Sequence, residues 1–324
     1  MEKWKKAVVH LECATDSEQF QNQRKRIDSL FQNLNEGEIS KEAFLEQISG
    51  RTRDIRFHGS AIFLKYNERR YLVTARHVLW DEHSAKGKYQ EESFKTIDNR
   101  EQIPVVLQDH ITQMINDTIF NIIFRVPSFD EILQNSFNRD RSFLMNLGAG
   151  TSFTVPYTFS KPEIDIAVVS LDQRDSRFAD NLISIGKEPI TLDDIVEGPS
   201  RESTEVFAVG YPSSTALLGY ISQHPDLAHW SSSYFSLPTF SFGRVSMVHD
   251  ELAFFWADMS IYPGNSGGPV IEGDKLVGVV SGQPTIPVED SEEFRTRIPF
   301  GKIIKAKFIT DLLSIQEQKD SNTL

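Results

Sequence analysis

The chain is poor in cysteine, in basic residues and in long apolar runs, and each shortage excludes a class of protein. Its one cysteine, Cys13, cannot form an intrachain disulfide, so the disulfide framework of a secreted protein is excluded. The 34 Lys and Arg against 46 Asp and Glu give a formal charge of −12, which argues against nucleic-acid binding through phosphates. No apolar run is long enough to span a membrane or to act as a signal-peptide core. We therefore expect a cytoplasmic protein that binds neither nucleic acid nor membrane.

Small and turn-forming residues surround one serine, Ser266. The segment reads Tyr262-Pro263-Gly264-Asn265-Ser266-Gly267-Gly268-Pro269. A serine hydroxyl is a poor nucleophile unless a base takes its proton and donors stabilise the oxyanion that forms. Glycines allow the sharp turn that would bring the N–H groups of Gly264 and Ser266 to one point. The same composition also suits a plain turn between two strands, so the presence of a base and an acid elsewhere decides between the two interpretations.

A candidate base and a candidate acid both lie in apolar segments. The apolar run 71–79 contains His77. Histidine is the natural base because the unperturbed pKa of an imidazole lies near neutrality. The run 164–169 contains one carboxylate, Asp165. A buried charge is costly unless it is paired, and pairing with the histidine N–H would fix its tautomer. These three residues therefore predict a nucleophile, a base and an orienting acid.

The three motifs occur in the order His77, Asp165, Ser266, and together they resemble those of the chymotrypsin-like serine peptidases. The resemblance implies an all-β fold of two six-stranded antiparallel Greek-key barrels with helical insertions and a C-terminal helix. It also implies hydrolysis of peptide bonds through an acyl-enzyme, with an oxyanion hole at Gly264, Asn265 and Ser266. No cofactor and no metal are expected.

Residues 257–269 are most similar to the HtrA-type branch of that family. Typical members of that branch are exported or organellar, whereas we expect a cytoplasmic and bacterial protein. Only a short polar tail follows the expected C-terminal helix, so we expect no PDZ domain. An uncharged Asn265 cannot bind a freshly cut N-terminus, so activation by N-terminal cleavage is not expected. The resemblance places Ser260 at the floor of the substrate pocket. The wall and the strand that would pair with substrate are assigned to Ser281, Gly282 and Gln283. An uncharged floor favours small or medium apolar side chains at P1, the residue before the cleaved bond.

We expect residues 1–324 to form a single peptidase domain. The N-terminal barrel spans about 1–180 and begins with a strand over 4–13, while the C-terminal barrel spans about 181–318 and ends in a helix over 305–315. Residues 15–49 have helical spacing and capping signals, which predict an inserted helical hairpin, either a lid packed on the barrel or a docking site for a regulatory protein. Longer insertions fall at 81–155, with one helix near 129–137, and at 213–237.

Two other functions remain open at this stage. The chain could be an inactive barrel that binds an extended peptide or a protein partner, because a fold alone does not imply a function. It could also be an effector peptidase that is silent until a partner activates it.

Overall fold

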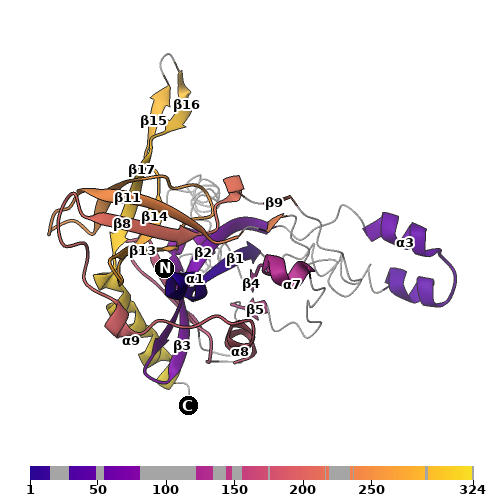
Figure 1. Ribbon diagram of the computed structural model, residues 1–324. Coiled ribbons are helices and arrows are strands. Elements are labelled where there is room, and N and C mark those ends of the chain that lie inside the picture. Colours follow the sequence, from indigo (N-terminus) through magenta and orange to yellow (C-terminus); the bar gives the residue numbers. More distant parts are fainter. Residues whose placement is uncertain are drawn as a thin grey trace, which may run out of the picture.

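The computed structural model describes residues 1–14, 29–48, 55–80, 122–133, 144–147, 155–173, 176–215, 217–218, 234–235, 237–288 and 291–322. Its main secondary structure is antiparallel β, arranged as a seven-stranded sheet and a closed barrel of six strands. Figure 1 shows the sheet, from the first half of the chain, beside the barrel, from the second half. The mostly β fold with a closed six-stranded barrel agrees with the fold expected from the sequence.

The N-terminal sheet has the strand order β5-β4-β1-β2-β3-β7-β6. Its strands are β1 (Val8–Ala14), β2 (Ile55–Tyr66), β3 (Arg69–Ala75), β4 (Ile122–Arg125), β5 (Leu144–Asn146), β6 (Tyr157–Phe159) and β7 (Ile166–Ser170). Among the described residues, no pairing joins β5 to β6. The described residues of the first half therefore form a seven-stranded sheet, and among them the closure of the expected six-stranded barrel is not seen.

The strand expected over residues 4–13 begins later than predicted. Helix α1 (Glu2–Ala7) precedes β1, and the strand starts at Val8. Trp4 and Ala7 are buried, and residues three apart lie on the same face of a helix. The prediction that the strand starts at residue 4 is therefore wrong, because the apolar residues at 4 and 7 have the spacing of a helix face.

The C-terminal barrel confirms the six antiparallel strands expected for the second half. They are β8 (Glu205–Gly210), β11 (Thr239–Met247), β12 (Phe254–Met259), β13 (Pro269–Glu272), β14 (Lys275–Gly282) and β17 (Phe300–Lys305). The order is β11-β12-β17-β14-β13-β8, and β8 pairs with β11 to close the barrel.

One apolar cluster joins the two β units. Ile62 and Val73 of the sheet share it with Val279 and Ile304 of the barrel. Helix α9 (Lys307–Ser321) packs Ile309 into the same cluster. This helix confirms the expected C-terminal helix, although it starts two residues later than predicted and ends six later. A site formed between sheet and barrel is thus held by a common core.

The described part of the expected helical hairpin is a pair of helices. Residues 29–35 are helical, α3 spans Lys41–Ile48, and Gly37 makes the turn between them with φ +76°. Ser40 Oγ accepts the N–H of Ala43 at 3.2 Å, as expected of a capping residue. Leu30 and Phe44 are buried against each other, and Figure 1 shows the pair standing apart from the sheet and the barrel, not as a lid on them. Residues 15–28 of the expected hairpin lie outside the described residues.

The remaining described elements lie in connections. They are α7 (Phe129–Leu133), α8 (Arg177–Ser184), β9 (Leu217–Leu218), β10 (Tyr234–Phe235), and the two-stranded sheet of β15 (Thr285–Val288) and β16 (Ser291–Arg297). Helix α7 confirms the helix expected near 129–137, whereas α8 and the β15–β16 hairpin were not predicted. Most of the insertions 81–155 and 213–237 lies outside the described residues. No helix of the described residues is long and apolar enough to cross a membrane.

Candidate active site

His77 stands where β3 ends and a short helix begins. Helix α4 (Arg76–Leu79) follows Ala75 directly, so the histidine leaves the sheet at the edge that faces the barrel. Its backbone N–H donates to Asp165 Oδ1 at 3.0 Å. The Thr74 hydroxyl, three residues earlier, donates to the Ser60 carbonyl at 2.7 Å and fixes the end of the strand.

Asp165 lies immediately before β7, in a left-handed backbone conformation with φ +51°. Non-glycine residues seldom adopt this conformation, which turns the carboxylate towards the histidine. His77 Nδ1 lies 2.9 Å from Oδ2, and the Ser281 hydroxyl donates to the same oxygen at 2.6 Å. Burial disfavours the ionised form, but the hydrogen bonds from His77 and Ser281 outweigh it, so the pKa of Asp165 is below its ordinary value.

Ser266 completes a continuous chain of hydrogen bonds. Its Oγ lies 3.0 Å from His77 Nε2. Because an ionised carboxylate accepts only, Nδ1 of His77 must donate to Asp165, which leaves Nε2 of the neutral ring free to accept the serine proton. The Ser266 carbonyl accepts the N–H of Ser60 at 2.8 Å, so the serine is attached to β2 of the N-terminal sheet. The three side chains that we predicted to act together thus meet between sheet and barrel.

The backbone before Ser266 forms a tight turn. The Asn265 N–H donates to the Tyr262 carbonyl at 3.0 Å, and Gly264 has φ +96°. Proline at the second turn position and glycine at the third are the residues that a type II turn favours. The Ser213 N–H donates to the Pro263 carbonyl at 2.8 Å.

These bonds determine where the turn's own N–H groups point. In a trans peptide the N–H points opposite to the C=O, so the Pro263 carbonyl bond directs the Gly264 N–H away from Ser213. The Ser60 hydroxyl donates to the Gly264 carbonyl at 2.7 Å and accepts the Tyr211 N–H at 3.0 Å. Among the described residues, no acceptor receives the N–H of Gly264 or of Ser266. Both groups are therefore available at the nucleophile, whereas the Asn265 side chain is buried.

A cavity of about 430 Å³ lies beside Ser266. Of the residues that the sequence assigned to the substrate pocket, Ser281, Gly282 and Gln283 line this cavity. Ser260 does not line it: its side chain is exposed, and Ile261 lines the cavity instead. The reason is that alternate side chains of β12 point into the barrel, so Phe255, Ala257 and Met259 are buried. The same alternation continues past the end of the strand. It therefore points Ile261 inwards and Ser260 outwards.

Sequence reasoning missed several residues that hold or line the site. Ser60 and Ser213 support the turn from other strands and loops, and Arg297 lines the cavity from β16. Ser60 had only a weak signal, because it stands in a Gly-Ser pair just before an apolar run. Among the described residues, no group of His, Cys, Asp and Glu side chains could hold a metal ion.

The antiparallel barrel and the histidine, aspartate and serine beside its cleft are features of the class of serine peptidases. The family model of the trypsin-like peptidase domain matches residues 59–279, so the chain belongs to that family. A search of curated proteins found no significant match.

Proposed function

We propose that the chain is a serine endopeptidase of the HtrA-type branch. The observation that carries this proposal is the hydrogen-bond chain from Ser281 through Asp165 and His77 to Ser266, with links of 2.6, 2.9 and 3.0 Å. Heavy-atom distances of this size allow proton transfer between nucleophile and base. The membership of the trypsin-like peptidase family supports the same function.

In the proposed mechanism, His77 takes the proton of Ser266 as the serine attacks a peptide carbonyl. The N–H groups of Gly264 and Ser266 stabilise the oxyanion, and Asp165 stays ionised and stabilises the imidazolium. His77 then gives the proton to the leaving amine, and water hydrolyses the acyl-enzyme by the same steps. Ile261 and Gln283 contribute no charge to their part of the pocket wall, which supports small or medium apolar P1 residues.

We also propose that residues 1–324 form one peptidase domain of two related barrels. The neighbour pattern of the strands supports this proposal. In the barrel the first strand, β8, pairs with the fourth, β13, and the third, β12, pairs with the last, β17. In the sheet, β1 pairs with β4 and β3 pairs with β7, which is the same pattern.

Labelling with a fluorophosphonate probe tests the proposed function. The probe should react with the native chain and form a covalent adduct at Ser266, because the serine has a base and two free N–H donors. The Ser266→Ala variant should give no adduct while keeping its melting temperature. Equal labelling of both proteins, or an adduct at another residue, would contradict the proposal.

Ser60→Ala should lower the rate of labelling about tenfold. The substitution removes the donor to the Gly264 carbonyl and the acceptor of the Tyr211 N–H, both buried, and an unsatisfied buried group costs about 1–3 kcal/mol. The turn can then rotate and move the Gly264 N–H away from the oxyanion position. Ser246→Ala, on an exposed part of β11, is the control and should label at the native rate. A native rate for Ser60→Ala would show that the turn holds its conformation without this hydroxyl.

A peptidase controlled by a partner is the second candidate function. It is favoured by the helical pair of residues 29–48, which packs Leu30 and Phe44 on each other and leaves Phe31 41% exposed. Such a pair could receive a regulatory protein without changing the barrels. A chain that labels only after addition of cell lysate, and loses this response when Phe31 is replaced with Ser, would support partner control. Complete labelling of the isolated chain would contradict it.

A further inference from the structure

The cavity beside Ser266 carries one permanent charge on the described residues that line it, the guanidinium of Arg297. Arg297 is the last residue of β16 and pairs with Thr285, the first residue of β15. Gln283, two residues before Thr285, donates through Nε2 to the Ile298 carbonyl at 3.5 Å. The base of the β15–β16 hairpin is thus attached to the pocket wall, while its two strands extend away from the barrel (Figure 1).

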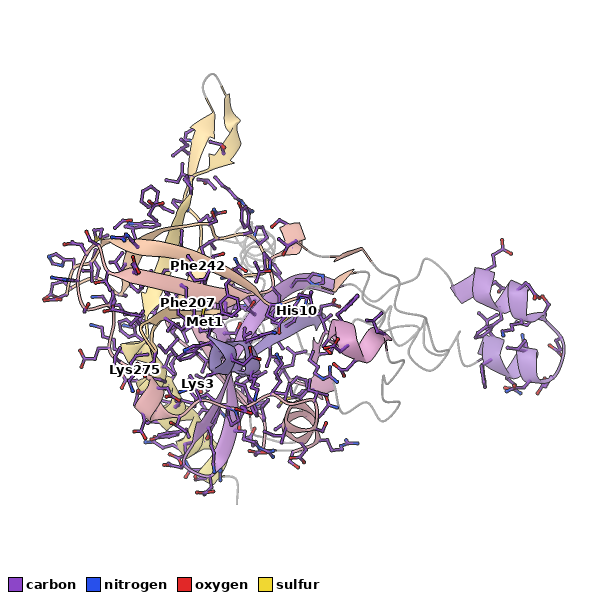
Figure 2. The ribbon with its side chains drawn as sticks, viewed as in Figure 1. Met1, Lys3, His10, Phe207, Phe242 and Lys275 are labelled. Carbon is purple, nitrogen blue, oxygen red and sulfur yellow. The ribbon has the colours of Figure 1, made fainter. Side chains whose placement is uncertain are left out.

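Arg297 differs from other arginines of the fold in its surroundings. Arg70, Arg125 and Arg244 each donate to a carboxylate, at Asp172, Glu131 and Glu205. Arg297 is exposed and makes no ion pair with any described residue. Side chains project from both the sheet and the barrel (Figure 2), and the chain as a whole carries a formal charge of −12. A free cation within the cleft of an acidic protein gives that cleft a field opposite to the overall charge.

The other ionisable groups of the cavity do not oppose a negative ligand. His58 and His77 line it together with Arg297. Burial lowers the pKa of His58 to about 4, so this ring is neutral at neutral pH. Two described carboxylates contact these histidines, but neither lines the cavity: Asp165 accepts from His77 and Ser281, and buried Glu12 lies 3.4 Å from His58 Nδ1. A carboxylate that enters the cavity therefore meets Arg297 without a competing acid among the described lining residues.

We propose that Arg297 forms a carboxylate-binding subsite of the cleft, which selects peptides with a negative group near the bond to be cleaved. A planar guanidinium can hold a carboxylate through two parallel hydrogen bonds, which gives direction as well as attraction. The carboxylate comes from an Asp or Glu side chain or from the C-terminus of the peptide. The inference names the substrate class of the site and so rests on the proposed function.

A binding experiment tests the subsite without requiring turnover. The Ser266→Ala variant is incubated with an array of immobilised peptides in which Asp, Glu, Asn and Gln are placed in turn at each position. The strongest acidic peptide and its amide counterpart are then measured by fluorescence anisotropy. The acidic peptide should bind about tenfold more tightly, in the range of a charge-assisted hydrogen bond. The difference should shrink in 1 M salt, where the screening length falls to about 3 Å.

Charge variants assign the preference to Arg297. In the Ser266→Ala background, Arg297→Gln should remove the preference and Arg297→Glu should reverse it. Arg244→Gln removes the same charge from the exposed outer face of β11 and should leave the preference unchanged. Amidation of the peptide C-terminus separates the two sources, because it abolishes binding only where the chain end supplies the carboxylate.

Two results would overturn the subsite. One is equal binding of acidic and amide peptides by the Ser266→Ala variant, and the other is an acidic preference that survives in Arg297→Glu. Failure of the proposed function has a different signature, since a chain that is not a peptidase gives no fluorophosphonate adduct but can still show binding that depends on Arg297. The active chain should show the same acidic preference in the cleavage sites that mass spectrometry finds in a peptide library.

Discussion

Replacement of Asp165 with Asn is expected to lower turnover of a peptide substrate about 10⁴-fold while the chain stays folded. The carboxylate now accepts from His77 Nδ1 at 2.9 Å. An amide at this position can instead donate to Nδ1, which puts the proton on Nε2 and removes the acceptor for Ser266. The uncharged amide also fails to stabilise the imidazolium. Because two effects act on the same histidine, the loss exceeds what one hydrogen bond would give.

The measurement combines kcat with the rate of fluorophosphonate labelling, and Asp258→Asn is the matched control. Asp258 is exposed on β12, so its loss removes one negative charge without touching the site. Retention of more than a tenth of the native turnover by Asp165→Asn would show that Asp165 does not set the tautomer of His77.

The stabilities of the native chain and of Asp165→Asn should depend differently on pH. The pKa of Asp165 is lower in the folded chain than its ordinary value. Its ionised form therefore stabilises the fold above the unfolded pKa of about 4, and this contribution is lost as the pH falls through the lower, folded pKa. The difference in unfolding free energy between the native chain and Asp165→Asn should shrink over that acidic window. A constant difference would show that the carboxylate is not stabilised by folding.

The residues of the candidate site that could be read from the sequence are those fixed by local chain geometry. A proline followed by glycine indicates a tight turn. A single charged residue inside an apolar strand indicates a buried, paired group. His77, Asp165 and Ser266 were indicated in this way and by the resemblance of their motifs to a known family, and the same resemblance implied the six strands of the barrel.

The site residues that were not predicted from the sequence depend on contacts between distant segments. Ser60 reaches the Gly264 carbonyl from 204 positions away, and nothing near Ser60 in the sequence indicates that partner. Ile261 rather than Ser260 lines the cavity because the alternation of β12 continues beyond its last paired residue, Met259. The β15–β16 hairpin escaped because its charged residues give no apolar alternation to detect. The position of Arg297 on the cavity lining could not be predicted, because it depends on how β16 lies beside Gln283.

Replacement of Gly267 with Ala is expected to destabilise the chain by roughly 3 kcal/mol or more and to abolish labelling, as overpacking and backbone strain act together. Gly267 has φ +84°, and a Cβ there would lie 2.0 Å from the Ser60 carbonyl oxygen and 2.2 Å from Thr74 Oγ1. Both of these atoms belong to the N-terminal sheet and are bonded to each other at 2.7 Å, so neither can move alone. To make room for the Cβ, the barrel would have to move away from the sheet at the place where Ser266 contacts His77.

Gly273→Ala separates the two causes. Gly273 also has positive φ, +62°, but a Cβ there meets no atom within 4 Å. The free energy of unfolding of this variant should fall only by the cost of a left-handed conformation for alanine, about 1–2 kcal/mol. The variant should label at the native rate. Thermal unfolding of both variants, read with their labelling, gives the comparison. Similar losses in the two would mean that backbone conformation alone requires glycine at 267. A large loss confined to Gly267→Ala would mean that the contact between sheet and barrel, which also brings serine to histidine, tolerates no side chain at this position.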